Sequence, residues 1–148
     1  RIGKADAPRL VILLGRQHPP EVTGAIAMEA FVDRIAEMAE ADPVLGRRYQ
    51  FMVIPLLNPD GVARGNWRAN LGGQDLNRDW GAFTQPETQA VKRWLEGLPV
   101  GIKAAAMLDF HSTHRNVFYV QGTEASEREE FFLDAWLGGK ENLIPGYL

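Results

Sequence analysis

The sequence contains no cysteine among its 148 residues, which excludes disulfide bonds, thiolate metal ligands and a thiol nucleophile. Serine is also scarce, because Ser112 and Ser126 are the only two and neither lies in the G-x-S-x-G motif of serine hydrolases. The glycine-rich motifs that bind nucleotide phosphates are absent as well. Histidine, carboxylate and arginine side chains therefore remain as the candidates for chemistry.

The sequence also has little excess charge and no long hydrophobic run. Its net charge is −3 without a basic stripe, and no apolar stretch approaches the roughly 18 to 20 residues of a transmembrane helix. We therefore predict no nucleic-acid partner and no membrane span. The first residue is Arg1, so we expect the natural N-terminus to lie upstream. The compartment (cytoplasmic, periplasmic or secreted) and the oligomeric state are left open.

Short apolar runs predict four β-strands, at residues 10–14, 51–57, 104–110 and 117–120. Helical spacing predicts a helix over residues 22–41, and a second helix that is capped by Thr84 and Glu87 and ends at Glu96. This order favours an α/β fold with a mixed, partly parallel central sheet flanked by helices. We expect one domain over residues 1–148, and expect it to be incomplete because the chain ends without a closing element.

Two of the three histidines follow predicted strands: His18 comes after the first and His111 directly after the third. Ligands of open α/β sheets bind at the carboxyl ends of the strands, so both residues are expected near one crevice. Glu21 follows His18 by three residues at the start of a helix, a spacing that lets both side chains face one point. Two histidines and a glutamate are a known zinc ligand set. The alternative is a surface histidine beside a glutamate that the helix dipole favours.

The segment of residues 58–80 is too long and too rich in Gly, Asn, Asp and Arg for a plain connection. It gathers three arginines, the residue type best suited to grip a carboxylate with two hydrogen bonds: Arg64, Arg68 and Arg78. This composition indicates an anionic ligand. The alternative is a structural network between these arginines and the aspartates of the same segment, Asp60, Asp75 and Asp79.

Together these motifs resemble the zinc metallocarboxypeptidase family (funnelins). The matching stretches stand in the family's order: HPPE at 18–21, NPDG at 58–61, Arg68 followed by GQDLNR at 73–78, and DFHST at 109–113. The resemblance covers residues 10–120, and the HPxE form is similar to the cytosolic-type and bacterial branch. It implies a zinc carboxypeptidase-like α/β/α fold of the phosphorylase/hydrolase-like type, present here as the N-terminal half of the catalytic domain.

The resemblance also implies roles for individual residues. His18, Glu21 and His111 would hold one zinc ion, and Arg68 would polarise the scissile carbonyl group. Asn77 and Arg78 would bind the C-terminal carboxylate of the substrate. The implied function is a zinc-dependent carboxypeptidase that hydrolyses the C-terminal bond of peptides or proteins through a zinc-activated water.

The sequence departs from the family in two places. Pro20 stands where digestive members carry an arginine, and neither the general-base glutamate nor the substrate-capping tyrosine of the family is found after His111. The glutamates that follow His111 lack the apolar strand that should place a base: Glu124, Glu127, Glu129, Glu130 and Glu141. Two alternatives therefore stay open. One is a deacylase of N-acyl amino acids like aspartoacylase and succinylglutamate desuccinylase, and the other is a non-catalytic binding module.

Overall fold

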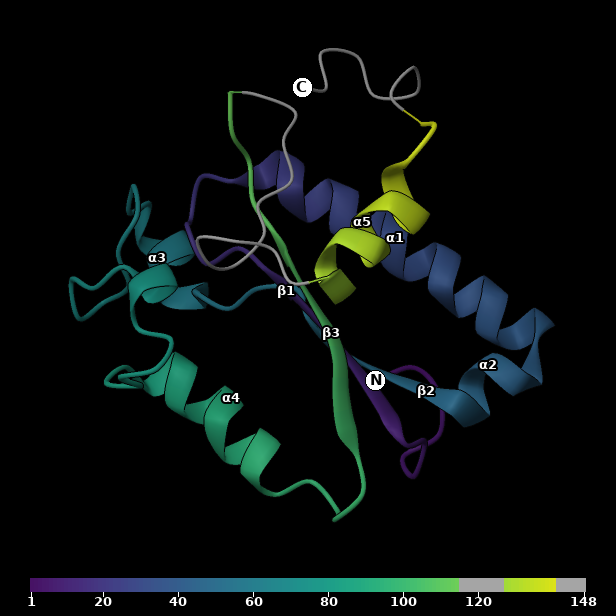
Figure 1. The fold of residues 1–148 in the computed structure, drawn as a ribbon. Coiled ribbons are helices and arrows are strands. Elements are labelled where there is room, and N and C mark those ends of the chain that lie inside the picture. The colour runs from purple at the N-terminus through teal and green to yellow at the C-terminus, as the bar shows by residue number, and fades with distance from the viewer. Residues whose placement is uncertain (115–126, 141–148) are drawn as a thin grey trace. The chain divides into compact units, whose positions relative to one another are not determined.

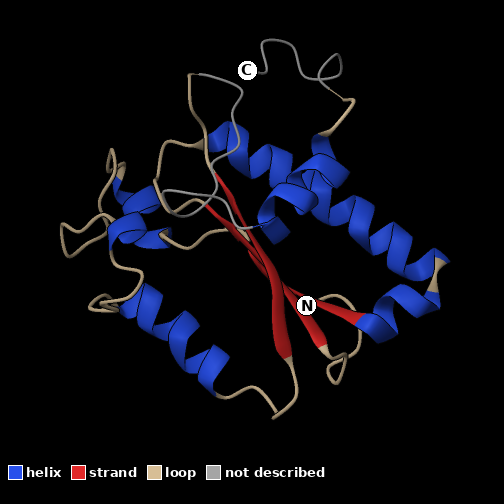
Figure 2. Cartoon of the chain, viewed as in Figure 1, coloured by secondary structure: helices blue, strands red, loops and turns tan. Residues whose placement is uncertain are grey.

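The computed structural model describes residues 1–114 and 127–140. The chain forms two compact units, residues 1–112 and 113–148. In the second unit the described helix is α5 (Glu127–Leu137). The first unit (Figure 1, Figure 2) contains, in chain order, β1 (Arg9–Gly15), α1 (Val22–Ala41), α2 (Pro43–Arg48), β2 (Tyr49–Ile54), α3 (Pro59–Arg64), the 3₁₀ helix η1 (Leu76–Arg78), α4 (Pro86–Glu96) and β3 (Lys103–Phe110).

The predicted α/β fold is confirmed, and most predicted elements lie where the apolar patterns placed them. β2 ends at Ile54 rather than residue 57, because Pro55 has no N–H group to donate to a neighbouring strand. The short helices α2 and α3 were not predicted. The predicted strand at 117–120 lies outside the described residues, and the prediction of a single partial domain stays a prediction. No described helix combines the length and the apolar character that crossing a membrane requires.

The sheet of the first unit is parallel, with the strand order β2-β1-β3. β1 lies in the centre and pairs directly with both neighbours. Leu10 lies opposite Gln50 of β2, and Gly15 lies opposite Phe110 of β3. The carboxyl ends of β1 and β3 therefore meet at one edge of the sheet. This is the edge where His18 and His111 follow their strands.

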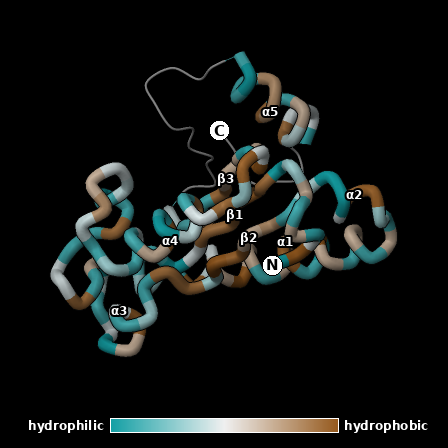
Figure 3. The backbone as a smooth tube through the Cα atoms, turned by 90° about the horizontal axis from the view of Figure 1, so that it is seen from below, coloured by the Kyte–Doolittle hydropathy of each residue, from teal (hydrophilic) through white to brown (hydrophobic). Residues whose placement is uncertain are grey.

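Helices cover both faces of the sheet (Figure 1). Side chains alternate along a strand, so Leu13 faces α1, where it packs with Met28, whereas Ile12 and its neighbours pack with Trp94 of α4 on the other face. Figure 3 shows the strands as the most hydrophobic part of the first unit. Burial on two faces explains why the central strand β1 is a continuous apolar run.

Asp79 anchors the first turn of α4. Its carboxylate accepts hydrogen bonds from the backbone N–H groups of Thr84 and Gln85, both at 2.9 Å, and from the hydroxyl groups of Thr84 (2.6 Å) and Thr88. Burial alone would raise the pKa of the Asp79 carboxyl group, but these hydrogen bonds outweigh it and hold that pKa well below its usual range. Asp79 is therefore a structural residue and not a partner of the arginines.

The predicted capping of α4 by Thr84 and Glu87 is wrong. The N-cap residue is Gln85, whose side chain makes no capping hydrogen bond. Thr84 donates to Asp79 instead, and Glu87 accepts a hydrogen bond from Asn70 at 3.0 Å. The Asp79 carboxylate thus holds the two residues before the helix and the hydroxyl group of Thr88 in its first turn.

Replacing Asp79 with asparagine is expected to lower the free energy of unfolding by about 1–3 kcal/mol at neutral pH, because a charged acceptor of four hydrogen bonds is lost. The pKa of Asp79 is lower in the folded protein than its ordinary value of 3.8, so the stabilisation is fully present above that pH and is lost as the pH falls further. Urea unfolding of both proteins at pH 7 and pH 3 measures the difference, which should shrink at pH 3. The exposed Asp60→Asn variant should change stability by less than about 0.5 kcal/mol at either pH. An Asp79 effect that does not vary with pH would contradict this assignment.

Candidate metal centre

A fixed turn carries the chain from β1 to His18. Arg16 adopts a left-handed backbone conformation with φ of 55°, and its Nη2 atom donates to the carbonyl oxygen of Pro19 at 2.7 Å. The backbone N–H groups of Leu57 and Asn58 donate to the carbonyl oxygens of Gly15 (3.0 Å) and Arg16 (3.2 Å), which ties this turn to the loop after β2. The turn buries His18, whose exposed fraction is 4%.

Glu21 occupies the N-cap position of α1, but its carboxylate does not cap the helix. It accepts a hydrogen bond from the backbone N–H of Ser112 at 3.2 Å, directly after His111. Gly24 makes this approach possible, because a Cβ atom at this position would lie 2.7 Å from the carbonyl oxygen of His111. The first turn of α1 therefore packs directly against the end of β3.

The three predicted metal ligands converge. The Nδ1 atom of His18 lies 2.8 Å from Oε1 of Glu21, and the Nδ1 atom of His111 lies 2.7 Å from Oε2 of the same carboxylate. The two imidazole rings are 5.0 Å apart between centroids. One ligand atom from each of the three residues lies within 4.8 Å of the other two. The structure thus joins residues that the sequence separates by 90 positions.

Each histidine also contacts an outer carboxylate through its Nε2 atom. His18 Nε2 lies 2.9 Å from Oδ1 of Asp75, and His111 Nε2 lies 2.7 Å from Oδ2 of Asp109. The hydrogen bond to Asp109 raises the pKa of His111 above its usual value; the charge of Glu21 adds to this, and partial burial opposes it. Both imidazoles are therefore oriented with Nε2 toward an aspartate and Nδ1 toward Glu21.

This arrangement fits a divalent cation. Two imidazoles and one carboxylate are the protein ligands of several catalytic zinc sites, in which the fourth position is left for water. A metal-ligating histidine usually donates its other ring N–H to a carboxylate, which fixes the ring and leaves a lone pair for the metal. His18 and His111 both have this environment. The burial of His18 does not agree with the alternative of a surface histidine, although Glu21 does stand at the N-terminus of α1, where the helix dipole favours a carboxylate.

Arg68 lies next to this centre. Its Nε atom donates to Oδ2 of Asp75 at 2.7 Å, and its side chain is about half exposed, with 49% of its surface accessible. Burial would raise the pKa of Asp75, but hydrogen bonds from three groups lower it: His18, Arg68 and the backbone N–H of Asn77. Asp75 therefore links Arg68 to the predicted ligand His18.

Asn77 and Arg78 belong to η1, which begins directly after Asp75. The backbone N–H of Asn77 donates to Oδ1 of Asp75 at 2.9 Å, which fixes the start of η1. The Arg78 guanidinium group is exposed and donates to the carbonyl oxygen of Asn77 at 3.2 Å. Both residues follow closely after Asp75, which contacts His18. Their predicted role in substrate binding stays a prediction.

Sequence reasoning gave no role to Asp109 and left Asp75 between two alternatives. A signal for Asp109 was present, because it precedes His111 by two residues and side chains two apart on a strand share a face. Asp75 pairs with Arg68, so the alternative of a structural network is correct for this pair. The glutamates Glu127, Glu129 and Glu130 lie in the first turn of α5, in the second unit, and Glu124 and Glu141 lie outside the described residues. The predicted lack of a general base stays a prediction.

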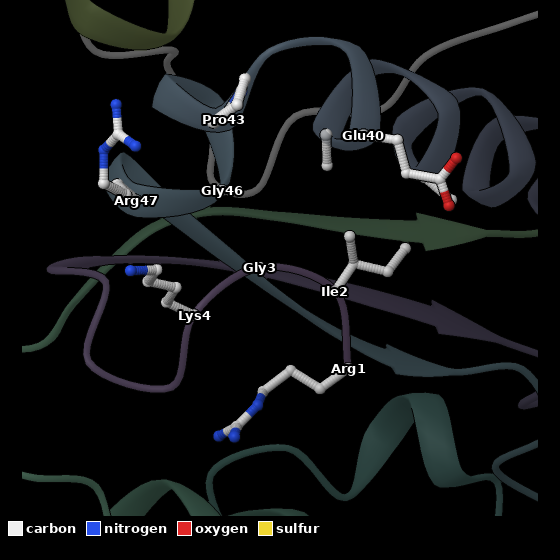
Figure 4. A pocket seen from close by; sticks show the side chains of 10 residues that line it. Arg1, Ile2, Gly3, Lys4, Glu40, Pro43, Gly46 and Arg47 are labelled. Carbon is white, nitrogen blue, oxygen red and sulfur yellow. The ribbon is translucent and has the colours of Figure 1, made fainter.

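A separate hollow lies between residues 1–4 and the ends of α1 and α2. Figure 4 shows that the cationic side chains of Arg1, Lys4 and Arg47 point away from one another and that Glu40 points away from all three. These groups do not converge on one ligand. The convergent set of polar groups is the one at the carboxyl ends of β1 and β3.

Comparisons with known sequences match this chain to a family. A family model described as zinc carboxypeptidase matches residues 3–135. Cytosolic carboxypeptidase 2 of Homo sapiens is 32% identical over 134 residues, which cover 85% of this chain and 14% of the human protein. Cytosolic carboxypeptidase 6 of Caenorhabditis elegans is 32% identical over 138 residues, which cover 87% of this chain and 30% of the nematode protein. The chain therefore spans less than a third of the length of these relatives.

Solved structures agree with the sequence matches. A metallo-carboxypeptidase from Burkholderia cenocepacia has a TM-score of 0.69 and 28% identity, over 95% of this chain and 39% of that chain. A carboxypeptidase from Burkholderia mallei has a TM-score of 0.70 and 26% identity, over 99% of this chain and 40% of that chain. A match over this much of the sequence, with the same fold, leads to one conclusion: the chain belongs to the zinc carboxypeptidase family.

Proposed function

We propose that this protein is a zinc-dependent carboxypeptidase that hydrolyses the C-terminal bond of peptides or proteins. One observation carries the proposal: the Nδ1 atoms of His18 and His111 meet the two oxygens of the Glu21 carboxylate, at 2.8 and 2.7 Å. Family membership supports it, and so do the names of the relatives, which are carboxypeptidases.

The ligands have a defined task in this proposal. His18, Glu21 and His111 would hold one zinc ion, which would act as a Lewis acid and lower the pKa of a bound water toward about 7. Asp75 and Asp109 keep the Nε2 protons of the two histidines, so that each Nδ1 atom is free to bind a metal. The burial of His18 keeps bulk water from competing for the same ligand atoms.

The arginines supply the positive charge that a peptide C-terminus requires. The Arg68 guanidinium group would stabilise the negative charge that develops on the scissile carbonyl oxygen, because a fixed cation beside that oxygen lowers the barrier. Arg78 and Asn77 would bind the terminal carboxylate, for which the planar guanidinium group is well suited. The exposure of Arg68 and Arg78 leaves both guanidinium groups accessible to a substrate.

Metal analysis and a peptide assay test the proposal together. The purified full-length protein is expected to contain one zinc ion per chain and to release C-terminal residues from a peptide panel. The same peptides with an amidated C-terminus should be cleaved much more slowly, since the amide removes the charge that Arg78 would bind. Chelation of the metal should abolish the release in both cases.

The remaining functions give different results in the same assay. A deacylase would release acyl groups from N-acyl amino acids and leave the peptides intact. A binding module would hold zinc or bind the peptide without cleaving it. Absence of zinc together with absence of peptide cleavage contradicts the proposed function.

A further inference from the structure

A buried glutamine connects the metal centre to the arginine-containing segment. Gln17 precedes His18 and is fully buried, with an exposed fraction of 0%. Its backbone carbonyl oxygen accepts a hydrogen bond from Nδ2 of Asn58 at 3.1 Å, so its main chain is fixed independently of its side chain. A buried amide group without partners is costly, and both ends of this one are used.

The two ends of the Gln17 amide contact different parts of the site. Its Oε1 atom accepts a hydrogen bond from the indole Nε1–H of Trp80 at 2.9 Å. Its Nε2 atom donates to Oδ2 of Asp109 at 2.5 Å, and the same oxygen accepts from His111 Nε2. A continuous chain of hydrogen bonds therefore runs from Trp80 through Gln17 and Asp109 to His111.

The donors and acceptors of this chain leave one orientation for the amide. The indole N–H can only donate, so it must face the Gln17 oxygen, and the Gln17 NH₂ group must then face the Asp109 carboxylate. With the amide reversed, an oxygen would face a carboxylate and an NH₂ group would face an N–H. Trp80 thus selects the orientation in which Gln17 donates to Asp109.

The orientation of the Asp109 carboxylate depends on Gln17 more than the orientation of the Asp75 carboxylate depends on any one partner. The second oxygen of Asp109, Oδ1, is buried without a hydrogen-bond partner among the described residues. Gln17 and His111 therefore hold the Asp109 carboxylate between them. Asp75, in contrast, is also held by the Arg68 side chain and the backbone N–H of Asn77. Loss of Gln17 would leave the carboxylate behind His111 free to turn.

We propose that Gln17, oriented by Trp80, is a positioning residue for the metal ligand His111 and thereby sets the metal affinity of the centre. This inference rests on the proposed function, because it requires that His111 binds zinc. The Gln17 side chain acts through Asp109, and its own hydrogen bonds go to Asp109 and Trp80 rather than to a ligand. Outer groups of this kind typically contribute about 10–100-fold to metal affinity, and Gln17 stands one step further out, so we expect about 10-fold.

A second buried glutamine provides a matched control. Gln50 of β2 is also fully buried, and its amide donates to the backbone carbonyl oxygen of Ala7 at 2.7 Å. It lies opposite Leu10, near the start of β1, whereas Gln17 follows the end of that strand. Replacing either glutamine by methionine removes a buried amide of similar volume, but only one of the two belongs to the metal centre.

The experiment compares zinc affinity in Gln17→Met, Trp80→Phe and Gln50→Met variants by competition with a chromophoric chelator. Gln17→Met and Trp80→Phe should each raise the zinc dissociation constant by about 10-fold, and the double variant should exceed the larger single effect only slightly, because both act through one chain. Gln50→Met should leave the constant within about twofold while lowering the thermal stability. The visible spectrum of the cobalt-substituted protein should change in the first two variants and not in the third.

Several outcomes would overturn the inference. It fails if Gln17→Met leaves the zinc dissociation constant and the cobalt spectrum unchanged, or if Gln50→Met changes both to the same degree. Trp80→Phe decides the matter where Gln17→Met does not fold, since phenylalanine keeps an aromatic ring at this position and removes the N–H donor. A wild-type protein that binds zinc and cleaves peptides but is insensitive to these variants contradicts the inference alone. A wild-type protein that binds no zinc contradicts the proposed function and the inference together.

Discussion

A Glu21→Gln variant is expected to lose more than about 100-fold in zinc affinity and to lose peptidase activity with it. The carboxylate of Glu21 lies between the Nδ1 atoms of both histidines. It is the one ligand of the three whose negative charge would offset the charge of a bound cation. Glutamine keeps the shape but removes the charge and presents an NH₂ group to one of the imidazoles. The loss should therefore exceed the roughly 10–100-fold that removal of an outer partner costs.

Competition with a chelator measures this affinity, and thermal unfolding shows whether the variant remains folded. Glu29→Gln is the matched control, because Glu29 is an exposed residue of the same helix and undergoes the same change of charge. The control should bind zinc like the wild type. If Glu21→Gln binds zinc within a few-fold of the wild type, the three-residue ligand set is wrong.

An Arg68→Ala variant is expected to reduce kcat/KM for peptide substrates by about 10²–10³-fold, mainly through kcat. The Arg68 guanidinium group is accessible, and its hydrogen bond to Asp75 holds it beside the predicted metal centre. At this position it would stabilise the oxyanion that develops during hydrolysis. Zinc should be retained, because Asp75 keeps the hydrogen bond from the backbone N–H of Asn77 and its contact with His18. A loss of turnover with the metal still bound separates this role from that of the ligands.

Steady-state kinetics with a peptide substrate and metal analysis of the same samples check this expectation. Arg64→Ala serves as the control, since Arg64 is an exposed arginine in the last turn of α3. Its kcat/KM should stay within about twofold of the wild-type value. An Arg68→Ala variant with unchanged kcat would remove Arg68 from the chemistry and leave it as a partner of Asp75.

The three ligands could be predicted from sequence because they depend on simple rules. His18 and His111 follow continuous apolar runs, and the carboxyl ends of parallel strands form one edge of the sheet. Glu21 could be predicted for a similar reason, since the spacing of three residues at a helix start places it near His18. Local sequence and one topological rule indicated that these residues lie near one another, and the resemblance to the metallocarboxypeptidases implied their role as ligands.

The residues around the ligands could not be predicted in the same way. The contact between Gln17 and Asp109 joins residues 92 positions apart and depends on the pairing of β1 with β3, which no local pattern reveals. The prediction that Thr84 caps α4 failed for a related reason. Thr84 donates to Asp79, which lies outside the sequence window in which a capping box is sought. The helices α2 and α3 have six residues each, too few to show a helical period.

The parallel pairing of β1 with β3 also links folding to metal binding. His18 and Glu21 are neighbours in any conformation of the chain, but His111 joins them only after two strands that lie far apart in sequence have paired. An unfolded chain keeps only His18 and Glu21 close together, so it would bind zinc more weakly than the native state. Zinc would therefore bind the native state selectively and stabilise it by about 2.7 kcal/mol at a free concentration of 100 times the dissociation constant. The stability of the fold would then vary with the free zinc concentration of the compartment in which the protein works.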